Sequence, residues 1–237
     1  MNEPNLRYAA AGTVARPAVD EGLRRYMLRV YNYMASGILL SGIVAYMAAS
    51  STSFMQAIWG SPLQWVVMLA PLAIIFVPFQ RLSVAAGQAV YWAFTAAIGL
   101  SLSIVLLAYT GASVARVFFI TAGMFGAMSL YGYSTKADLS RFTTFLMMGV
   151  IGIVIASVVN AFLGSSALQF AISVIGVVVF TALVAWNTQM IKETYYLAQS
   201  EEDEGRSAVM GALALYVNFI NLFQALLSLL GVRTSND

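Results

Sequence analysis

The stretch that decides the fold runs from Phe142 to Ile191 and reads FTTFLMMGVIGIVIASVVNAFLGSSALQFAISVIGVVVFTALVAWNTQMI. Its 50 residues include no Asp, Glu, Lys or Arg. A helix needs roughly 20 apolar residues to cross a bilayer, so this stretch is long enough for two crossings. The turn-forming residues from Asn160 to Ser166, with Gly164 among them, supply the break between the two helices. The stretch predicts a polytopic, all-α membrane protein.

Four other uncharged stretches extend the same pattern and cover residues 30–80, 82–115, 117–135 and 207–232. The first is 51 residues long and contains turn residues at 50–53 and 60–62, so it also holds two spans, whereas the others hold one each. The sequence therefore predicts a bundle of seven transmembrane helices. The predicted spans are Met27–Ala49, Leu63–Phe79, Ala85–Tyr109, Ser113–Tyr133, Phe142–Leu163, Leu168–Ile191 and Ala208–Leu230.

The distribution of positive charge orients this bundle. With seven spans, ten of the twelve Lys and Arg residues fall on one side and only Arg116 and Arg233 fall on the other. Positive residues gather on the cytoplasmic side of membrane proteins, so the N-terminus is predicted to be cytoplasmic and the C-terminus external. The second span is the least regular because Pro71 and Pro78 each remove a backbone donor, and losing that span would invert everything downstream.

The same boundaries divide the chain into three parts. Residues 1–26 are too charged for a signal-peptide core and are predicted to form a flexible cytosolic tail. Residues 27–230 form the predicted seven-helix membrane domain, and residues 231–237 form a short C-terminal tail. With so little of the chain outside the predicted spans, the lipid bilayer is expected to be the main contact of the protein.

Composition excludes several functional classes. The chain is 60% hydrophobic and 9% charged, with a net charge of +2 and no basic patch, so no nucleic-acid partner is expected. It contains no Cys and no His, which removes thiol, imidazole and Cys/His metal chemistry, and no catalytic residue, cofactor or metal site is predicted. No charge lies deep within a span, which argues against proton-coupled pumps and intramembrane aspartyl proteases. A small-solute transporter is a weaker reading because no inverted repeat is visible.

Small residues four positions apart occur in several of the predicted spans. This spacing lets two helices approach closely in lipid, so we interpret these pairs as helix-packing sites in preference to the lining of a permeation route. The pairs are Gly37 with Ser41, Gly99 with Ser103, Gly123 with Ala127, and Gly152 with Ala156.

Polar residues inside the bilayer concentrate in the last two spans. Asn187 lies near the end of the sixth span, and Asn218, Asn221 and Gln224 follow one another at three-residue steps along one face of the seventh. Two interpretations remain open. The amides hydrogen-bond across helices and stabilise packing, or they line a seam that water can enter.

Five specific motifs occur in order along the chain. They are Tyr109-Thr110-Gly111, Phe118-Phe119-Ile120-Thr121-Ala122, Ser129-Leu130-Tyr131-Gly132-Tyr133, Lys136-Ala137-Asp138-Leu139-Ser140 and Asn187-Thr188-Gln189-Met190-Ile191-Lys192. Together they closely resemble the bacterial inner-membrane branch of the Bax inhibitor-1 family. The resemblance implies a seven-helix bundle with a central seventh helix, in a family described as calcium-permeable leaks and as suppressors of cell death or stress.

At two positions the sequence differs from the family that it resembles. Its proposed pH-sensing centre is a pair of aspartates, and the matching positions here are Asn187 and Asn218, with Arg81 nearest to a latch arginine in the second helix. Two carboxylates repel and share a proton, whereas two amides do not titrate. We expect the two amides to hydrogen-bond to each other and to hold the seam closed or weakly conducting at any pH.

Two functional hypotheses follow. In the first, the protein is a calcium-leak member of this family, and calcium ions pass between the central helix and its neighbours. In the second, it is a non-transporting regulator that binds other membrane proteins, for example a quality-control protease. Calcium flux in liposomes separates the two.

Overall fold

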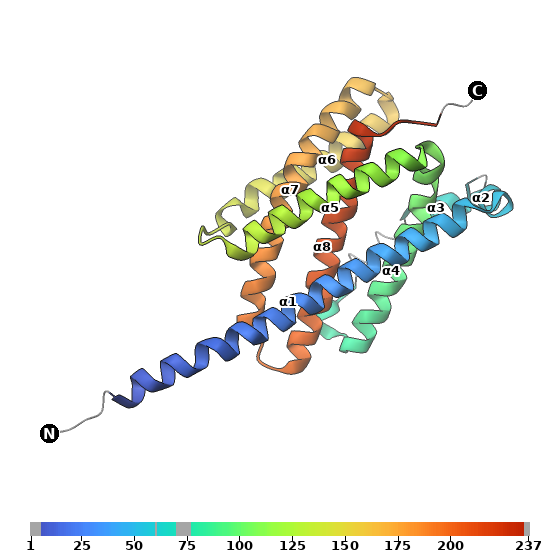
Figure 1. Ribbon diagram of the computed structural model, residues 1–237. Coiled ribbons are helices and arrows are strands. Elements are labelled where there is room, and N and C mark those ends of the chain that lie inside the picture. Colours follow the sequence, from blue (N-terminus) through green and yellow to red (C-terminus); the bar gives the residue numbers. More distant parts are fainter. Residues whose placement is uncertain (1–5, 60, 70–76, 235–237) are drawn as a thin grey trace.

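The computed structural model describes residues 6–59, 61–69 and 77–234, with the backbone alone for residues 6–20 and Gln80. This part of the chain contains eight α-helices and no β-strand, and six of the helices are long and apolar enough to cross a membrane (Figure 1). The helices are α1 (Leu6–Ala49), α2 (Thr52–Trp59), α3 (Leu63–Leu69), α4 (Val84–Ala108), α5 (Gly111–Ser134), α6 (Thr143–Leu163), α7 (Ser166–Leu197) and α8 (Glu201–Leu230). Two short 3-10 helices, η2 (Phe79–Arg81) and η3 (Ser140–Phe142), precede α4 and α6.

The last helix, α8, is the centre of the bundle, as expected. It packs against α1, α4, α5 and α7, and half of its membrane-spanning segment is buried, against 11% for α6 at the rim (Figure 1). We call the end of the bundle where α8 begins, at Glu201, the proximal end, and the end where it finishes, at Leu230, the distal end. The side chains of α6 face outwards along most of its length, which suits a helix surrounded by lipid.

Helices α1 and α4 run parallel to each other. Gly37 of α1 faces Thr95 of α4, and one turn further along both helices Ser41 faces Gly99, so the contacts advance in the same direction. The chain therefore returns across the bundle between the end of α1 and the start of α4, as a seventh crossing requires. Of the predicted span Leu63–Phe79, the structure describes α3 and residues 77–79, and residues 70–76 lie outside the described part. The count of seven spanning helices stays a prediction.

The predicted boundaries hold for three spans and change for three others. Helices α4, α5 and α6 end within two residues of their predicted limits. Helix α1 begins at Leu6, well before residue 27, and Leu23 and Tyr26 are buried. The predicted boundary at residue 27 therefore falls inside a helix. The physical reason is that the apolar face of Val30 and Met34 continues backwards at helical spacing past the two arginines.

Helices α7 and α8 are also longer than predicted, and a short turn joins them at the proximal end. Helix α7 continues to Leu197, and α8 begins at Glu201. Ser200 caps α8, because its side chain accepts a hydrogen bond from the backbone N–H of Asp203 at 3.1 Å. Four acidic residues at 201–204 form the first turn, where the helix dipole favours negative charge. The acidic cluster therefore forms the start of a helix.

Glycine allows two pairs of helices to approach closely. A Cβ atom on Gly99 would lie 2.7 Å from the backbone oxygen of Ser41, and one on Gly132 would collide with the backbone of Ala185. The first contact joins α4 to α1, and the second joins α5 to α7. Gly37 is equally confined, by the Tyr91 ring, so the predicted packing role is confirmed for Gly37 and Gly99.

The packing role predicted for Gly123 and Gly152 is wrong. No atom of the described residues lies within 4 Å of a Cβ built on either glycine, so both face open space. The two glycines lie in helices that expose much of their surface, and no helix approaches them. The four-residue spacing of small residues identifies faces on which helices are able to pack, but it does not identify which of those faces are used.

These contacts predict contrasting effects of the same substitution. Gly99→Ala and Gly132→Ala place a methyl group against backbone and should each cost about 1–3 kcal/mol of stability. Gly123→Ala and Gly152→Ala meet no atom and should be neutral or should stabilise by up to about 1 kcal/mol, because Ala favours helix. Thermal unfolding of the four variants in detergent checks this. Equal melting temperatures for all four would contradict the described packing.

Candidate functional site

The centre of the polar seam is Asn218 in α8. Its side chain is 5% exposed, and its Nδ2 group has no hydrogen-bond partner among the described residues. An amide donor left unpaired in a buried position costs roughly 1–3 kcal/mol, so native proteins rarely keep one without a reason. Asn218 is therefore an unusual group at the heart of the bundle.

Asn187 lies near Asn218 but does not bond to it. Its Nδ2 atom donates to the backbone oxygen of Leu183, one turn back on α7, at 3.1 Å. The contacts of Gly211 with Ile191 and of Gly176 with Ala225 fix the antiparallel register of α7 and α8. In this register, Asn218 is level with residue 184, about one helical turn (about 5 Å) from the level of Asn187. The expected bond between the two amides is wrong for this reason.

Arg81 is not joined to this pair. It ends η2 at the proximal end of the bundle, and its side chain is exposed. The Arg81 side chain makes no hydrogen bond or ion pair within the described residues, and only its backbone N–H bonds, to the oxygen of Pro78 at 2.9 Å. Arg206 of α8 instead donates from Nε to the backbone oxygen of Leu82 at 2.8 Å, and so fastens the start of α4 to α8. Arg206 therefore joins the segment before α4 to α8, whereas the resemblance pointed to Arg81.

Asn221 and Gln224 face a polar cavity. It has a volume of about 420 Å³ and lies between α6, α7 and α8 in the distal half of the bundle. Asn221 also donates from Nδ2 to the backbone oxygen of Val217 at 2.9 Å. The structure thus brings two of the predicted seam residues together in one cavity, whereas Asn218 lies deeper in the bundle and is not in its wall. The other polar residues of the wall are Ser157, Gln169, Ser173 and Ser228.

A hydrogen-bond network borders this cavity, and the sequence analysis missed it. Asn160 of α6 donates to Gln169 Oε1 at 3.1 Å, and Ser173 of α7 donates to Ser228 of α8 at 2.9 Å. Gln169 also lies 3.4 Å from Ser228. The available signal was the run Gln169, Ser173 and Gly176, whose small or polar residues share one helical face. This run is short and carries no charge, so its sequence looks the same as that of an ordinary helix-packing face.

Two residues of the Asn187-Thr188-Gln189 motif of α7 hold neighbouring segments in place through hydrogen bonds. Gln189 accepts a hydrogen bond from the N–H of Leu139 and donates one to the oxygen of Ala137, both at 2.8 Å. Its neighbour Thr188 bonds to Ser129 of α5 at 3.1 Å. Helix α7 therefore holds both α5 and the loop that follows it. This explains the motif without any part in transport.

The charged groups with assigned partners lie at the proximal end or in loops. Arg29 of α1 pairs with Glu204 of α8 at 3.4 Å, which joins the two helices. In the loop before α6, hydrogen bonds from Ser140 hold the pKa of the Asp138 carboxyl below its ordinary value. Within the described residues, no group of three or more acidic, Cys or His side chains could hold a metal ion. The cavity is polar but has no charge in its wall.

This fold and site define a class: a multi-pass α-helical membrane protein with an uncharged polar cavity beside a central helix. Comparison with known proteins then gives the family. Residues 23–235 match the family model described as inhibitor of apoptosis-promoting Bax1, so the chain belongs to the Bax inhibitor family.

Relatives with similar sequences agree with this assignment. The chain is 40% identical to the inner membrane protein YbhL of Escherichia coli over 96% of its own length and 99% of that protein. It is 48% identical to an uncharacterized protein of Rickettsia prowazekii, over 90% of its length and 92% of the relative. It is 32% identical to an uncharacterized membrane protein of Streptococcus pyogenes, over 90% and 94%. The protein is a multi-pass protein of the inner membrane.

The position of Gln189 predicts a graded loss of order in the loop between α5 and α6. Gln189→Leu removes both hydrogen bonds to the loop, whereas Gln189→Glu keeps an acceptor for the N–H of Leu139 and loses only the donor to Ala137. We expect limited proteolysis after Lys136 to be fastest for the Leu variant, intermediate for the Glu variant and slowest for the native chain. Gln56→Leu, in the exposed part of α2, is the matched control. Equal cleavage rates would contradict the role of Gln189.

Proposed function

We propose that the protein is a low-conductance calcium leak of the inner membrane whose flux does not depend on pH. The observation that carries this proposal is the cavity of about 420 Å³ within the membrane-spanning part of the bundle, whose wall carries amides and hydroxyls among apolar side chains. Lipid tails do not solvate such groups, so a polar cavity at this depth suits water and a hydrated ion. The family resemblance supplies calcium as the ion.

The side chains of the cavity wall are suited to passing calcium ions and not to binding them tightly. Calcium prefers oxygen ligands, and the side chains of Asn221, Gln224 and Gln169 offer carbonyl oxygens while the serines offer hydroxyls. Calcium affinity rises with the number of carboxylate ligands, and the wall has none. Neutral oxygens therefore bind the ion weakly, and an ion that binds weakly can leave as easily as it enters.

We place the narrowest part of the proposed route at the level of the two asparagines. Between the cavity and the proximal end, α8 carries Leu215 and Phe219, which are both buried. Asn218, with its unpaired Nδ2, lies in the same buried stretch of α8. With the N-terminus in the cytoplasm, as the charge distribution predicts, the cavity belongs to the external half and the narrowest part to the cytoplasmic half.

The asparagines make the narrowest part insensitive to pH. Carboxylates at both positions, about 5 Å apart along the helix axes, would repel by about 3 kcal/mol at an effective dielectric constant of ~20. This repulsion raises the pKa of the pair, so one proton is shared at low pH and lost as the pH rises. Amides have no such transition, and the native seam stays in one state.

Restoring both carboxylates should therefore create a pH switch. We expect the native chain in liposomes to pass calcium slowly and at equal rates at pH 6 and pH 8. Asn187→Asp with Asn218→Asp should pass calcium several-fold faster at pH 8 than at pH 6, because both groups are ionised only at the higher pH. Fluorescence of a calcium indicator inside the liposomes measures the rate.

The two single Asp variants are the controls, because a lone carboxylate has no like-charged partner and should give a much smaller pH effect. No flux above that of empty liposomes, from the native chain and from the double variant at both pH values, would overturn the proposed leak. Equal rates at the two pH values for a conducting double variant would leave the leak standing and refute the pH switch.

The cavity wall gives a second test of the leak. Gln224→Leu removes an amide from the wall and should lower the native calcium flux several-fold, because the ion loses a neutral oxygen ligand. Thr121→Val is the matched control. It also removes a polar group from a membrane helix, but its hydroxyl bonds only to Val117 of its own helix, away from the cavity. Flux that falls equally in both variants would show that the cavity has no special part.

A further inference from the structure

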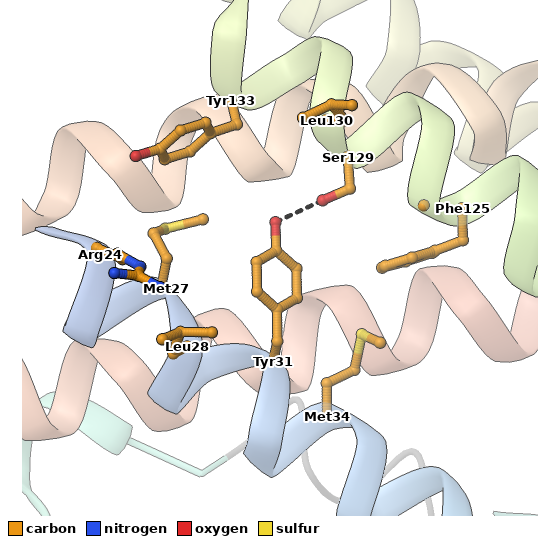
Figure 2. Close-up of a pocket in the computed structure, with 10 residues that line it drawn as sticks. Arg24, Met27, Leu28, Tyr31, Met34, Phe125, Ser129, Leu130 and Tyr133 are labelled. Carbon is orange, nitrogen blue, oxygen red and sulfur yellow. Dashed lines mark hydrogen bonds between the residues drawn. The ribbon is translucent and has the colours of Figure 1, made fainter.

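A second hollow of different character lies between α1 and α5. It is a groove of about 550 Å³ (Figure 2), and we call it the α1–α5 groove. Helix α8 lies behind it, where the rings of Phe125 and Phe219 are in contact at 5.7 Å between centroids. Leu28 and Leu130 on its two sides are at least half exposed, so the groove opens towards the bilayer. Its lining residues are Arg24, Met27, Leu28, Tyr31, Met34, Phe125, Gly126, Ser129, Leu130 and Tyr133.

The groove is polar at one end and apolar at the other. Figure 2 shows the Arg24 guanidinium and the Tyr133 hydroxyl together at one end, and the side chains of Met34 and Phe125 at the other. The polar end is the proximal end, because α1 enters the bundle there and α5 finishes there. A ligand that fits this groove therefore has a polar head and an apolar tail.

The middle of the groove offers no free hydrogen-bonding group. The Tyr31 and Ser129 hydroxyls lie 2.5 Å apart and bond to each other, as Figure 2 shows, and Ser129 bonds in turn to Thr188 at 3.1 Å. Thr188 donates to the oxygen of Val184 in its own helix. Since these hydroxyls are all satisfied within the protein, the floor suits a hydrocarbon chain and not a polar solute.

The head of the ligand meets positive charge. The Arg24 side chain is exposed and has no ion pair within the part of the chain whose side chains are described. Lys192 adds a second cation nearby, because its Nζ atom donates to the oxygen of Tyr133 at 3.1 Å and lies 5.4 Å from the centre of that ring. A negatively charged headgroup complements this end.

The dimensions of the groove separate a lipid from a protein partner. Ten residues of helix separate Arg24 from Met34, a rise of about 15 Å, which is half of a hydrocarbon core about 30 Å thick. The groove therefore spans one leaflet. A helix of that length and about 10 Å across would fill roughly 1,200 Å³, more than twice the volume of the groove. A partner helix would thus lie over the groove, whereas a single acyl chain lies within it.

We propose that the α1–α5 groove binds one anionic phospholipid from the leaflet at the proximal end, which is the cytoplasmic leaflet in the predicted orientation. The phosphate pairs with Arg24, and one acyl chain follows the floor past the Tyr31 and Ser129 pair to Phe125. The proposal does not depend on calcium flux, because the groove and the polar cavity lie on different helices.

Gly126 provides a way to close the groove without disturbing the fold. It lies in the groove wall, and no atom lies within 4 Å of a Cβ built on it. Gly126→Trp should therefore fill the groove and displace the chain. Gly123→Trp is the matched control, since Gly123 is equally open on the same helix but is not part of the wall. Arg24→Gln tests the headgroup contact, with Arg116→Gln at the other end of α5 as its control.

Native mass spectrometry of the purified full chain, mixed with equal amounts of phosphatidylglycerol and phosphatidylcholine, measures which lipid is retained. We expect the native chain to retain phosphatidylglycerol about fivefold better, which is the preference that one basic residue gives at a membrane surface. Arg24→Gln should bring the ratio close to one, and Gly126→Trp should lose the bound lipid. Both control variants should behave as the native chain does.

Two results would overturn the proposal. One is equal retention of the two lipids by the native chain. The other is a Gly126→Trp variant that retains lipid as well as Gly123→Trp does. If Gly126→Trp melts at a lower temperature than its control, the smaller Gly126→Leu replaces it, with Gly123→Leu beside it, and the same two outcomes decide.

Discussion

The bundle depends on the hydrogen bonds of the Ser41 hydroxyl. It lies 2.6 Å from the Tyr216 hydroxyl of α8, and it is within hydrogen-bond distance of the backbone oxygens of Thr95 on α4 and Gly37 on its own helix. Three helices therefore meet at one buried oxygen. This approach is possible only because Gly99 brings the backbone of α4 against that of Ser41. Within a bilayer no water can satisfy these groups, so the helices must pack closely enough for the groups to hydrogen-bond to one another.

The same constraint explains where polar groups are found elsewhere. Neutral side chains that reach a partner, such as Ser129, Thr188 and Ser173, lie within the spans and join helices. Charged pairs such as Arg29 with Glu204 lie at the proximal end, where water and headgroups can solvate them. Asn218 departs from this pattern because its buried Nδ2 has no partner. Tyr26, Trp59 and Thr181 also have an unpaired buried polar atom, but Asn218 is the amide among these four described residues and lies on α8 near a cavity whose wall carries other amides.

Much of this architecture could be predicted from the sequence, because the bilayer sets the length of its elements. The long uncharged stretches gave α4 to α6 within two residues, and the central position of α8 followed from the family resemblance. Helix ends outside the apolar region were missed, because water does not limit helix length as the bilayer does. Among the predicted packing glycines, Gly99 contacts a helix and Gly152 does not, since sequence spacing defines a face but not its neighbour.

The candidate site could be predicted less well, because it depends on register and on side-chain direction. The sequence shows that Asn187 and Asn218 occupy neighbouring helices, but a shift of one turn between α7 and α8 decides whether their amides meet. Gln169 and Ser228 are separated by 59 residues and share a cavity only because α7 and α8 are antiparallel neighbours. Such a cavity is defined by three helices at once and leaves no local motif.

The two hollows of the bundle differ in a way that follows from the helices around them. Serines and amides repeat on the facing sides of α7 and α8, so the hollow beside α6 has polar walls that lipid tails do not solvate. Along α1 and α5, Met, Leu and Phe face each other, and the hydroxyls between them are already paired. Hydrocarbon can fill the middle of the second hollow without facing a free polar group, whereas in the first it would face the amides and hydroxyls of the wall. We therefore propose different occupants for the two hollows from the chemistry of their walls: water and ions beside α6, and an acyl chain beside α1.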